Sequence, residues 1–246
     1  MNIYKEINEK IIYDEWIESK AKGRGGVGIT LESLLGKETE NFEIPDYKGI
    51  ELKTKCSKIE KDITLFSSVP DSYLFEIKRL NEKYGKADKE YPQFNTFNLA
   101  IYGNRKVKYN QNYFKLYVDY NKKQVFLKVY DLNNNIIDSD AAWSFDLLKE
   151  KLERKLKCMA LIHADRKFAH NTVYFKYKDI AFYNLISFDR FLVLLTKGII
   201  KVTFRIGFYK NDKKFGQVYD HGTSFSINEN NLEKLFKKVE LCDQGE

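Results

Sequence analysis

Cysteine, proline and long apolar runs are scarce in this sequence, and each scarcity excludes a class of protein. The three cysteines, Cys56, Cys158 and Cys242, are odd in number and form no Cys-x-x-Cys pair, which argues against a disulfide framework or a structural zinc site. Only three prolines occur, so no proline-rich linker is present. No apolar run reaches the roughly 18 residues of a membrane helix, and residues 1–20 lack the apolar segment of a signal peptide. We expect a protein of a reducing cytoplasm that makes no membrane contact.

The composition provides ample material for a packed core and a moderate excess of positive charge. Of 246 residues, 43% are apolar and 15% are aromatic, and the net charge is +7. The length suits one large domain or two small ones. The basic excess suggests an anionic partner such as nucleic acid, although many soluble proteins are equally basic.

Hydrophobic periodicity predicts a mixed α+β fold, with a second lobe possible in the C-terminal half. Apolar residues recur at helical spacing over 3–20, and a short helix is expected in ITLESLLG, closed by Gly36. Residues 140–162 are predicted to form one long helix, capped by Asp140 or Ser144. Further helices are expected over 71–83, 188–198 and 228–241. Strands are predicted at 49–55, 63–70, 94–104, 112–120, 124–132, 172–183, 199–210 and 223–227, with a hairpin turn at 121–123.

The stretch IPDYKGIELKTK combines two carboxylates with a lysine. In a strand, residues i and i+2 share a face, so Glu51 and Lys53 project together while Leu52 points into the core. Asp46 lies just before the strand, close enough to converge on them. Two carboxylates suit Mg²⁺, and a neighbouring lysine could position or deprotonate a water that attacks a phosphodiester. The alternative is the ordinary polar face of an exposed strand, which explains Glu51, Lys53 and Lys55 without any function.

The segment KGRGGVGITLESLLG places a glycine-rich turn before a helix. Its glycines match G-x-G-x-x-G, but a charged helix precedes them and no Gly-Lys-Ser/Thr follows, so neither a dinucleotide fingerprint nor a P-loop is indicated. Lys22 and Arg24 could still bind a DNA phosphate at the helix N-terminus; a flexible start to the helix is the alternative. Within the helix, Glu32 lies on a different face from the leucines.

A lysine-rich segment near the C-terminus is the candidate for DNA contact. Cations alternate there with aromatic residues on or beside one predicted hairpin: Arg205, Lys210, Lys213 and Lys214 with Phe208, Tyr209 and Phe215. Arginine can bond guanine O6 and N7, and aspartate can accept from cytosine N4. Arg205, Asp220 and His221 are therefore candidate readers of a G·C-rich site, Tyr209 could pack against a base edge, and the lysines suit phosphates. Thr223 completes the predicted contact set, and the alternative is a solvated, lysine-tipped hairpin.

In their order along the chain, these segments resemble the MvaI/BcnI restriction enzymes, in the MutH-type branch of the restriction-endonuclease-like nucleases. The glycine-rich turn, GITLESLLG, Asp46, GIELKTK and ITLFSSVP form one ordered series, and the four-residue gap between Asp46 and Glu51 fits the MvaI/BcnI type. Downstream, FRIGFYKNDKKF resembles the DNA-entering segment of MutH, and VYDHGTSF resembles the ending of the MvaI/BcnI enzymes. The resemblance implies a catalytic set of Glu32, Asp46, Glu51 and Lys53, with Asp46, Glu51 and Leu52 at the metal.

The implied fold is a restriction-endonuclease-like core, in which helices flank a central mixed β-sheet and two lobes surround a DNA cleft. Residues 1–100 would form the catalytic lobe. Residues 101–246 would form the DNA-recognition lobe together with the remaining core elements.

The implied activity is that of a Mg²⁺-dependent type II restriction endonuclease, which cuts double-stranded DNA at a short CC-N-GG type site, best matched by CCWGG. It would act as a monomer that nicks one strand at a time and leaves 5′-phosphate ends. A cognate DNA methyltransferase is expected in the same cell, without a stable complex. Two alternatives stay open: a MutH-like repair nicking endonuclease that needs a partner protein, and a non-catalytic DNA-binding protein.

Overall fold

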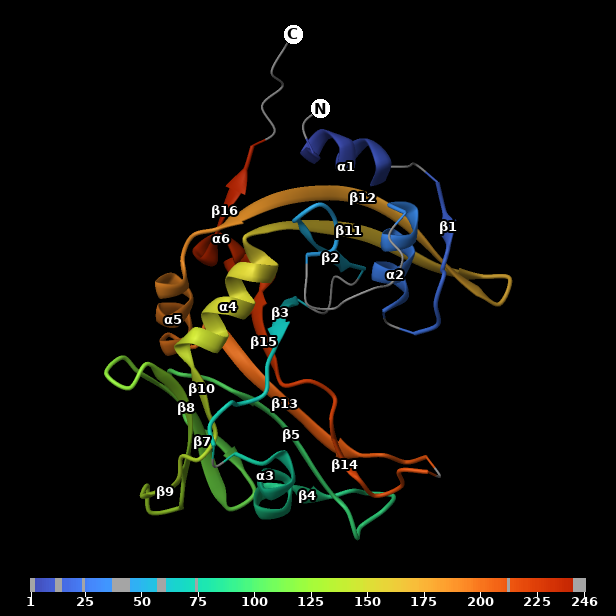
Figure 1. The fold of residues 1–246 in the computed structure, drawn as a ribbon. Helices are drawn as coiled ribbons and strands as arrows, with labels where there is room; N and C mark the ends of the chain where they lie inside the picture. Colours follow the sequence, from blue (N-terminus) through green and yellow to red (C-terminus); the bar gives the residue numbers. More distant parts are fainter. Residues whose placement is uncertain are drawn as a thin grey trace. The chain divides into compact units, whose positions relative to one another are not determined.

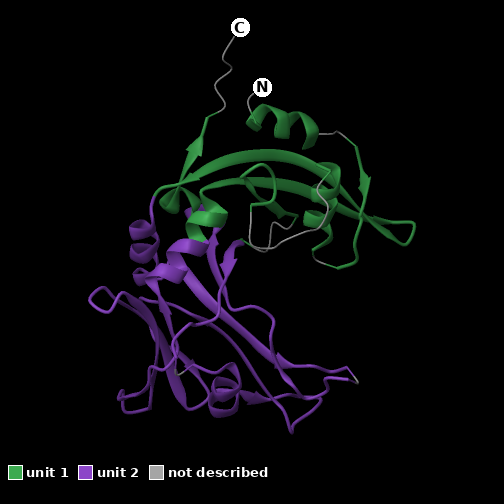
Figure 2. Ribbon diagram, viewed as in Figure 1, with its two compact units in different colours: residues 1–61, 152–186, 232–246 green, residues 62–151, 187–231 purple. Residues whose placement is uncertain are grey.

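The computed structural model describes residues 3–11, 15–23, 25–36, 45–56, 61–73, 75–211 and 213–240. The chain forms two compact units, which Figure 2 shows in green and purple. Unit 1 comprises Met1–Lys61, Leu152–Ile186 and Leu232–Glu246, and unit 2 comprises Asp62–Lys151 and Ser187–Asn231. The two units therefore alternate along the chain, and neither ends near residue 100.

Unit 1 is a mixed β-sheet with helices packed on it (Figure 1). Its strands lie in the order β1 (Ile17–Glu18), β12 (Thr172–Leu185), β11 (Cys158–Ala169) and β2 (Glu51–Lys55), with β16 (Phe236–Val239) also paired to β12. Strand β2 runs parallel to β11, and the other pairs are antiparallel. Helices α1 (Ile3–Ile11) and α2 (Gly26–Leu34) bury Ile7, Ile11 and Leu31 in the core that they share with the sheet.

Unit 2 contains two sheets that pack together through aromatic rings. The first has the order β3 (Asp62–Ser67), β15 (Ser224–Asn228), β13 (Ile200–Phe208), β5 (Asn95–Ile101) and β4 (Lys86–Ala87), with β14 (Val218–Asp220) on β13. The second has the order β10 (Ala142–Ser144), β8 (Gln124–Tyr130), β7 (Asn112–Asp119) and β6 (Val107–Tyr109), with β9 (Ile136–Asp138) on β8. Fully buried rings join them: the centroids of Phe97 and Phe114 lie 5.5 Å apart, and those of Trp143 and Phe204 lie 5.9 Å apart.

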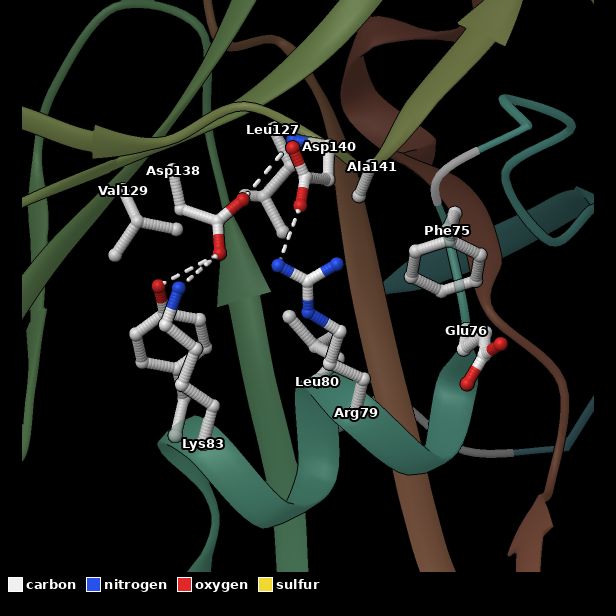
Figure 3. Close-up of a pocket in the computed structure, with 11 residues that line it drawn as sticks. Phe75, Glu76, Arg79, Leu80, Lys83, Leu127, Val129, Asp138, Asp140 and Ala141 are labelled. Atoms are coloured by element: carbon white, nitrogen blue, oxygen red, sulfur yellow. Dashed lines mark hydrogen bonds and ion pairs between the residues drawn. The ribbon is translucent and has the colours of Figure 1, made fainter.

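Helix α3 (Ile77–Tyr84) is tied to the second sheet of unit 2 by polar contacts, which Figure 3 shows. Lys83 Nζ lies 2.8 Å from Asp138 Oδ2, and Arg79 Nη2 lies 3.0 Å from Asp140 Oδ2. Tyr84 also donates to Asp138, and burial raises the pKa of this tyrosine to about 12. The small pocket between these groups is therefore a structural contact of unit 2. Within the described ranges, no helix is long and apolar enough to cross a membrane.

Several predicted elements are confirmed where local sequence signals are strong. Strands β2 and β3 lie in predicted strand segments. Helix α2 overlaps the short helix predicted over 29–36 but begins three residues earlier, at Gly26, and Gly36 follows it with φ +74°. Lys123 has φ +51° in the predicted turn between β7 and β8. Helix α5 (Phe188–Thr196) is followed by Gly198 with φ +66°, as expected for a C-terminal glycine.

Four predicted helices are wrong in extent. The helix expected over 3–20 ends at Ile11, the one over 71–83 begins at Ile77, and the one over 140–162 is only α4, Phe145–Leu156. The helix expected over 228–241 consists of a 3-10 turn, Glu229–Asn231, and α6, Leu232–Leu235. Three of these segments instead contain strands in part: β1, β10 with the start of β11, and β16. The apolar start of β11 is buried between β2 and β12, and such a run cannot be distinguished from a buried helix by periodicity. Strands β1 and β16 depend on pairing with the distant β12.

Replacing Phe114 by alanine tests the ring packing between the two sheets of unit 2. Because the ring is fully buried, its removal leaves a cavity, and we expect the free energy of unfolding to fall by about 3–5 kcal/mol. Tyr117→Ala is the matched control, since Tyr117 lies on the opposite face of the same strand and is 43% exposed. Its cost should stay below about 1 kcal/mol. Urea unfolding measures both, and equal losses would contradict this packing.

Candidate active site

A two-residue turn positions the predicted acidic pair. Tyr47 and Ile50 exchange backbone hydrogen bonds of 2.9 and 2.8 Å. Between them, Lys48 and Gly49 have φ angles of +45° and +87°. Positive φ at both central residues is typical of a type I′ turn, which reverses the chain tightly. The residue before the turn therefore comes to lie beside the start of β2.

Asp46, the residue in question, is held against β2 by its own side chain. Its Oδ2 accepts a hydrogen bond of 2.9 Å from the backbone N–H of Leu52. Strand β2 is the last strand of the described sheet, and the N–H and C=O of one strand residue point to the same side. The Leu52 carbonyl therefore points toward the same open edge as Asp46, away from β11.

Glu51 and Lys53 project from the same face of β2. Lys53 Nζ lies 2.6 Å from Glu51 Oε1, as the i, i+2 spacing predicts. Glu51 is only 2% exposed, and its Oε2 has no hydrogen-bond partner among the described residues. A buried carboxylate oxygen without a partner is unfavourable unless a cation or donor from outside the chain satisfies it.

A second lysine approaches Glu51 from α4. Lys155, in the last turn of that helix, has its Nζ 3.7 Å from Glu51 Oε1. Glu51 pairs with Met159 in the parallel register of β2 and β11, so the residues just before β11 lie beside the start of β2. Sequence reasoning missed Lys155 because only this register brings it to the site.

The oxygen donors fit a hard divalent cation. The Asp46 carboxylate, the unpartnered Glu51 oxygen and the Leu52 carbonyl come from one turn and one strand. Among the described residues, no three Asp, Glu, His or Cys side chains gather closely enough to hold a metal by themselves. Mg²⁺ is commonly bound through one or two carboxylates and keeps several waters, whereas structural zinc takes Cys and His. The donor set therefore fits Mg²⁺.

Glu32 lies half-buried on α2, the helix that packs on β2. A Cβ at Gly28, one turn earlier, would lie 3.5 Å from Thr54 Oγ1 of β2. Residues i and i+4 share a helix face, so Glu32 lies on the side of α2 that faces this strand. Within the described chain, however, it does not join Asp46 and Glu51 in a three-carboxylate cluster.

Residues 19–21, just before the glycine-rich segment, lie close against the start of α2. A Cβ at Gly26 would lie 2.7 Å from both the Ala21 carbonyl oxygen and Ser19 Oγ. The Thr30 hydroxyl donates to the Gly26 carbonyl at 2.7 Å and accepts from the Lys20 N–H at 2.9 Å. These contacts argue against a loosely held start to the helix.

Helix α1 contacts the Asp46 turn through Glu6. This carboxylate accepts from the Tyr47 hydroxyl at 2.8 Å, from Lys48 Nζ at 2.8 and 2.9 Å, and from Lys10 Nζ at 3.2 Å. The Lys48 ammonium, followed by Tyr47 and Lys10, lowers the pKa of Glu6 to about 2, so the carboxylate is ionised at neutral pH. Sequence reasoning missed Glu6 as well, because its turn partners lie 41 and 42 residues away.

The residues predicted to read bases lie together at one turn of unit 2. Arg205 is exposed, and its guanidinium donates to the carbonyl oxygens of His221 and Gly222 at 3.1 to 3.3 Å. The Asp220 carboxylate accepts from the Gly222 N–H and from the Thr223 hydroxyl, both at 2.9 Å. Thr223 is only 1% exposed, so the structure places it beneath the surface, where it supports Asp220.

Lys210, predicted to contact DNA, is engaged in ion pairs. Its Nζ lies 2.9 Å from Glu90 and 3.5 Å from Asp88, and the hydrogen bond to Glu90 raises its pKa. The ammonium also lies 5.1 Å from the ring centroid of Tyr91. Lys210 therefore joins β13 to the loop before β5.

The other predicted cations differ from Lys210. Lys213 and Lys214 are exposed, and the Lys214 ammonium lies 5.2 Å from the Tyr209 ring centroid. Lys22 is exposed beside the start of α2. Arg24 lies outside the described residues. Surface exposure leaves Lys22, Lys213 and Lys214 accessible to a phosphate backbone.

Known proteins resemble this chain over nearly its whole length. A model of the MvaI/BcnI restriction endonuclease family matches residues 5–236. Two solved structures match at 34% identity over 97% of this chain and 96% of theirs: restriction endonuclease MvaI in complex with its cognate DNA substrate, with a TM-score of 0.86, and MvaI in the absence of DNA, with a TM-score of 0.64. No curated protein matches the chain. The solved structures confirm the predicted α+β fold and extend the likeness across the middle of the chain.

Gly26→Ala tests the tight start of α2. The added Cβ would collide with a backbone oxygen and Ser19, so we expect the free energy of unfolding to fall by about 1–3 kcal/mol. Gly25→Ala is the matched control, because Gly25 has φ −74° and nothing lies within 4 Å of the position that its methyl group would occupy. Thermal unfolding followed by circular dichroism compares the two, and a stable Gly26→Ala protein would contradict the close approach.

Proposed function

Because the chain belongs to the MvaI/BcnI restriction endonuclease family, it is a site-specific DNA endonuclease, and we propose that Asp46, Glu51 and Lys53 form its Mg²⁺-dependent active centre. The observation that carries this proposal is the buried Oε2 of Glu51, which has no partner among the described residues. The alternative of an exposed polar strand predicts a solvated carboxylate. An exposure of 2% for Glu51 argues against that alternative.

Three oxygen donors would hold the metal: the carboxylates of Asp46 and Glu51 and the Leu52 carbonyl. Glu32 is a further acidic group on the side of α2 that faces β2. Bound Mg²⁺ would polarise the scissile phosphodiester and lower the pKa of the attacking water. The Leu52 amide fixes the Asp46 carboxylate, so the aspartate is oriented before any ligand arrives.

Lys53 would act on the reacting phosphate. Its side chain is 22% exposed and paired with Glu51, so its ammonium is fixed on one face of β2 but remains accessible to substrate. In the reaction, a water oxygen attacks phosphorus, the P–O3′ bond breaks, and the 3′ oxygen takes up a proton, which yields a 5′-phosphate and a 3′-hydroxyl. Lys53 would hydrogen-bond the water or a phosphate oxygen and stabilise the developing negative charge. Lys155 provides a second ammonium at the same Glu51 oxygen.

The turn at the end of β14 is proposed to read double-stranded DNA. The solved complex of MvaI with its cognate DNA supports a duplex substrate. Arg205 would donate to guanine, Asp220 would accept from cytosine, and His221 would contact a neighbouring base edge in the major groove. Lys213 and Lys214 would contact phosphates, which fix position rather than sequence.

The remaining predicted contacts take secondary parts in this proposal. Lys22, and Arg24 by its position in the sequence, would bind phosphate near α2, and Tyr209 would pack against a base edge. Lys210 and Thr223 would support the hairpin, because one is paired with Glu90 and the other is buried.

We further propose a site of the CC-N-GG type, with CCWGG as the best candidate, cut by a monomer one strand at a time. Family membership supports the class of site. The proposed acidic centre can act on one strand at a time, which supports sequential nicking. A cognate methyltransferase in the same cytoplasm would protect the host sites, without a stable complex.

Asp46→Ala tests the acidic centre. It removes a proposed metal ligand, so we expect Mg²⁺-dependent cleavage to fall by at least about 10³-fold, while specific binding of DNA without Mg²⁺ is retained. Asp179→Ala is the matched control, because Asp179 is an exposed carboxylate in the same unit. Gel-shift and cleavage assays on one oligonucleotide duplex measure both properties. An Asp46→Ala protein that cuts at the normal rate would overturn the assignment.

Digestion of supercoiled plasmid with one CCWGG site tests the monomer. We expect open-circle DNA to accumulate before linear DNA, because the two strands are cut in separate events. Direct conversion to the linear form would contradict a monomer.

A digest of phage DNA separates restriction from repair. Discrete bands would support a restriction enzyme, whereas nicks without double-strand breaks would favour a repair-type enzyme. Sequencing of the ends identifies the site and the cut position.

A further inference from the structure

We infer that Glu6 is a positioning residue for the metal centre, which it serves by fixing the turn that carries Asp46. The inference rests on the proposed function, since it assigns a residue to the metal site proposed above. Glu6 lies on α1, far from the acidic motif in sequence, and its contacts converge on the two residues that directly follow Asp46.

Both oxygens of the Glu6 carboxylate accept hydrogen bonds from residues of the turn. Oε1 accepts from the Tyr47 hydroxyl at 2.8 Å and from Lys48 Nζ at 2.9 Å, and Oε2 accepts from the same Nζ at 2.8 Å. Lys10 reaches both Glu6 and the Tyr47 hydroxyl, at 3.2 and 3.1 Å. Glu6 is only 9% exposed. These are charge-assisted bonds, the stronger class of protein hydrogen bond.

The turn needs such support because its backbone is unfavourable for a lysine. Lys48 has φ +45°, a left-handed conformation that side chains with a Cβ adopt at a cost in energy. Such a conformation persists where the surroundings over-determine it. The ion pair to Glu6 holds the Lys48 side chain in place. The conformation of the turn then fixes the position at which the Asp46 carboxylate accepts from the Leu52 amide.

The helix that carries Glu6 is itself firmly placed. Ile7, the next residue, and Ile11 are both fully buried in the core of unit 1. Glu6 is therefore held in a fixed position. The Asp46 turn is hydrogen-bonded to α1 through Glu6 and to β2 through the Leu52 amide.

The charge of Glu6 has a second effect on the same site. It neutralises the Lys48 and Lys10 ammonium groups, which lie within bonding distance of it. Without this carboxylate, two uncompensated positive charges would stand beside the turn of Asp46 and would oppose the approach of a divalent cation. Loss of position and loss of charge therefore act in the same direction on metal affinity.

The test compares Glu6→Gln with Glu9→Gln in the full chain. Glu9 is an exposed glutamate on the same helix, so its variant controls for the loss of one negative charge from α1. We expect Glu6→Gln to raise the Mg²⁺ concentration for half-maximal binding, measured by calorimetry without DNA, by about tenfold. For Glu6→Gln, the Mg²⁺ concentration for half-maximal cleavage should rise by the same factor, and the cleavage rate at saturating Mg²⁺ should match wild type. The Glu9→Gln protein should match wild type in both measurements.

Tyr47→Phe is the second variant and keeps the test decisive if Glu6→Gln does not fold. It removes one hydrogen bond to Glu6, so we expect a smaller loss of Mg²⁺ affinity in the same direction. A Glu6→Gln protein that melts earlier but binds Mg²⁺ as wild type does would reduce Glu6 to a structural role and overturn the inference. An unchanged affinity in Tyr47→Phe would do the same where Glu6→Gln is unfolded. Wild-type protein that folds but neither binds Mg²⁺ nor cuts DNA with it would overturn the proposed function, and the inference with it.

Discussion

The hydrogen bond from the Leu52 amide to the Asp46 carboxylate determines where the proposed active centre forms. It is available because β2 is the last strand of the described sheet, so that the amide faces an open edge rather than a neighbouring strand. A free edge is ordinarily a liability, since its backbone groups invite pairing with another chain. Here a side-chain carboxylate satisfies the amide, and the Leu52 carbonyl remains directed at the same edge.

The environment of Glu51 follows from the parallel pairing of β2 with β11. A carboxylate that is almost fully buried is strongly unfavourable unless cations compensate it. Lys53 on the same strand and Lys155 just before β11 both approach one of its oxygens, at 2.6 and 3.7 Å. The other oxygen lacks a partner among the described residues. The strand register thus brings two ammonium groups to one oxygen of the glutamate and leaves the other oxygen available to the proposed metal.

The grouping of residues at the centre of the candidate site could be predicted from the sequence because its geometry is local. Glu51 and Lys53 share a face through the period of a strand, and the short spacing brings Asp46 to them through one turn. Lys155 and Glu6 could not be predicted, since they reach the site through the β2–β11 register and the packing of α1. The same limit explains the errors in the fold. Residues 158–162 are apolar enough to extend the preceding helix, and only their position between two strands makes them a strand.

The turn proposed to read DNA shows how a small set of contacts can prepare specificity. Gly222 has φ +101°, a conformation that favours glycine, and its carbonyl accepts from the Arg205 guanidinium while its amide donates to Asp220. One glycine thus orients both an arginine and an aspartate. A base-reading side chain that is already ordered loses less conformational entropy when it binds, and the planar guanidinium is suited to such fixation. Sequence discrimination in this family member is therefore expected to depend on the backbone of the turn as much as on the side chains that touch bases.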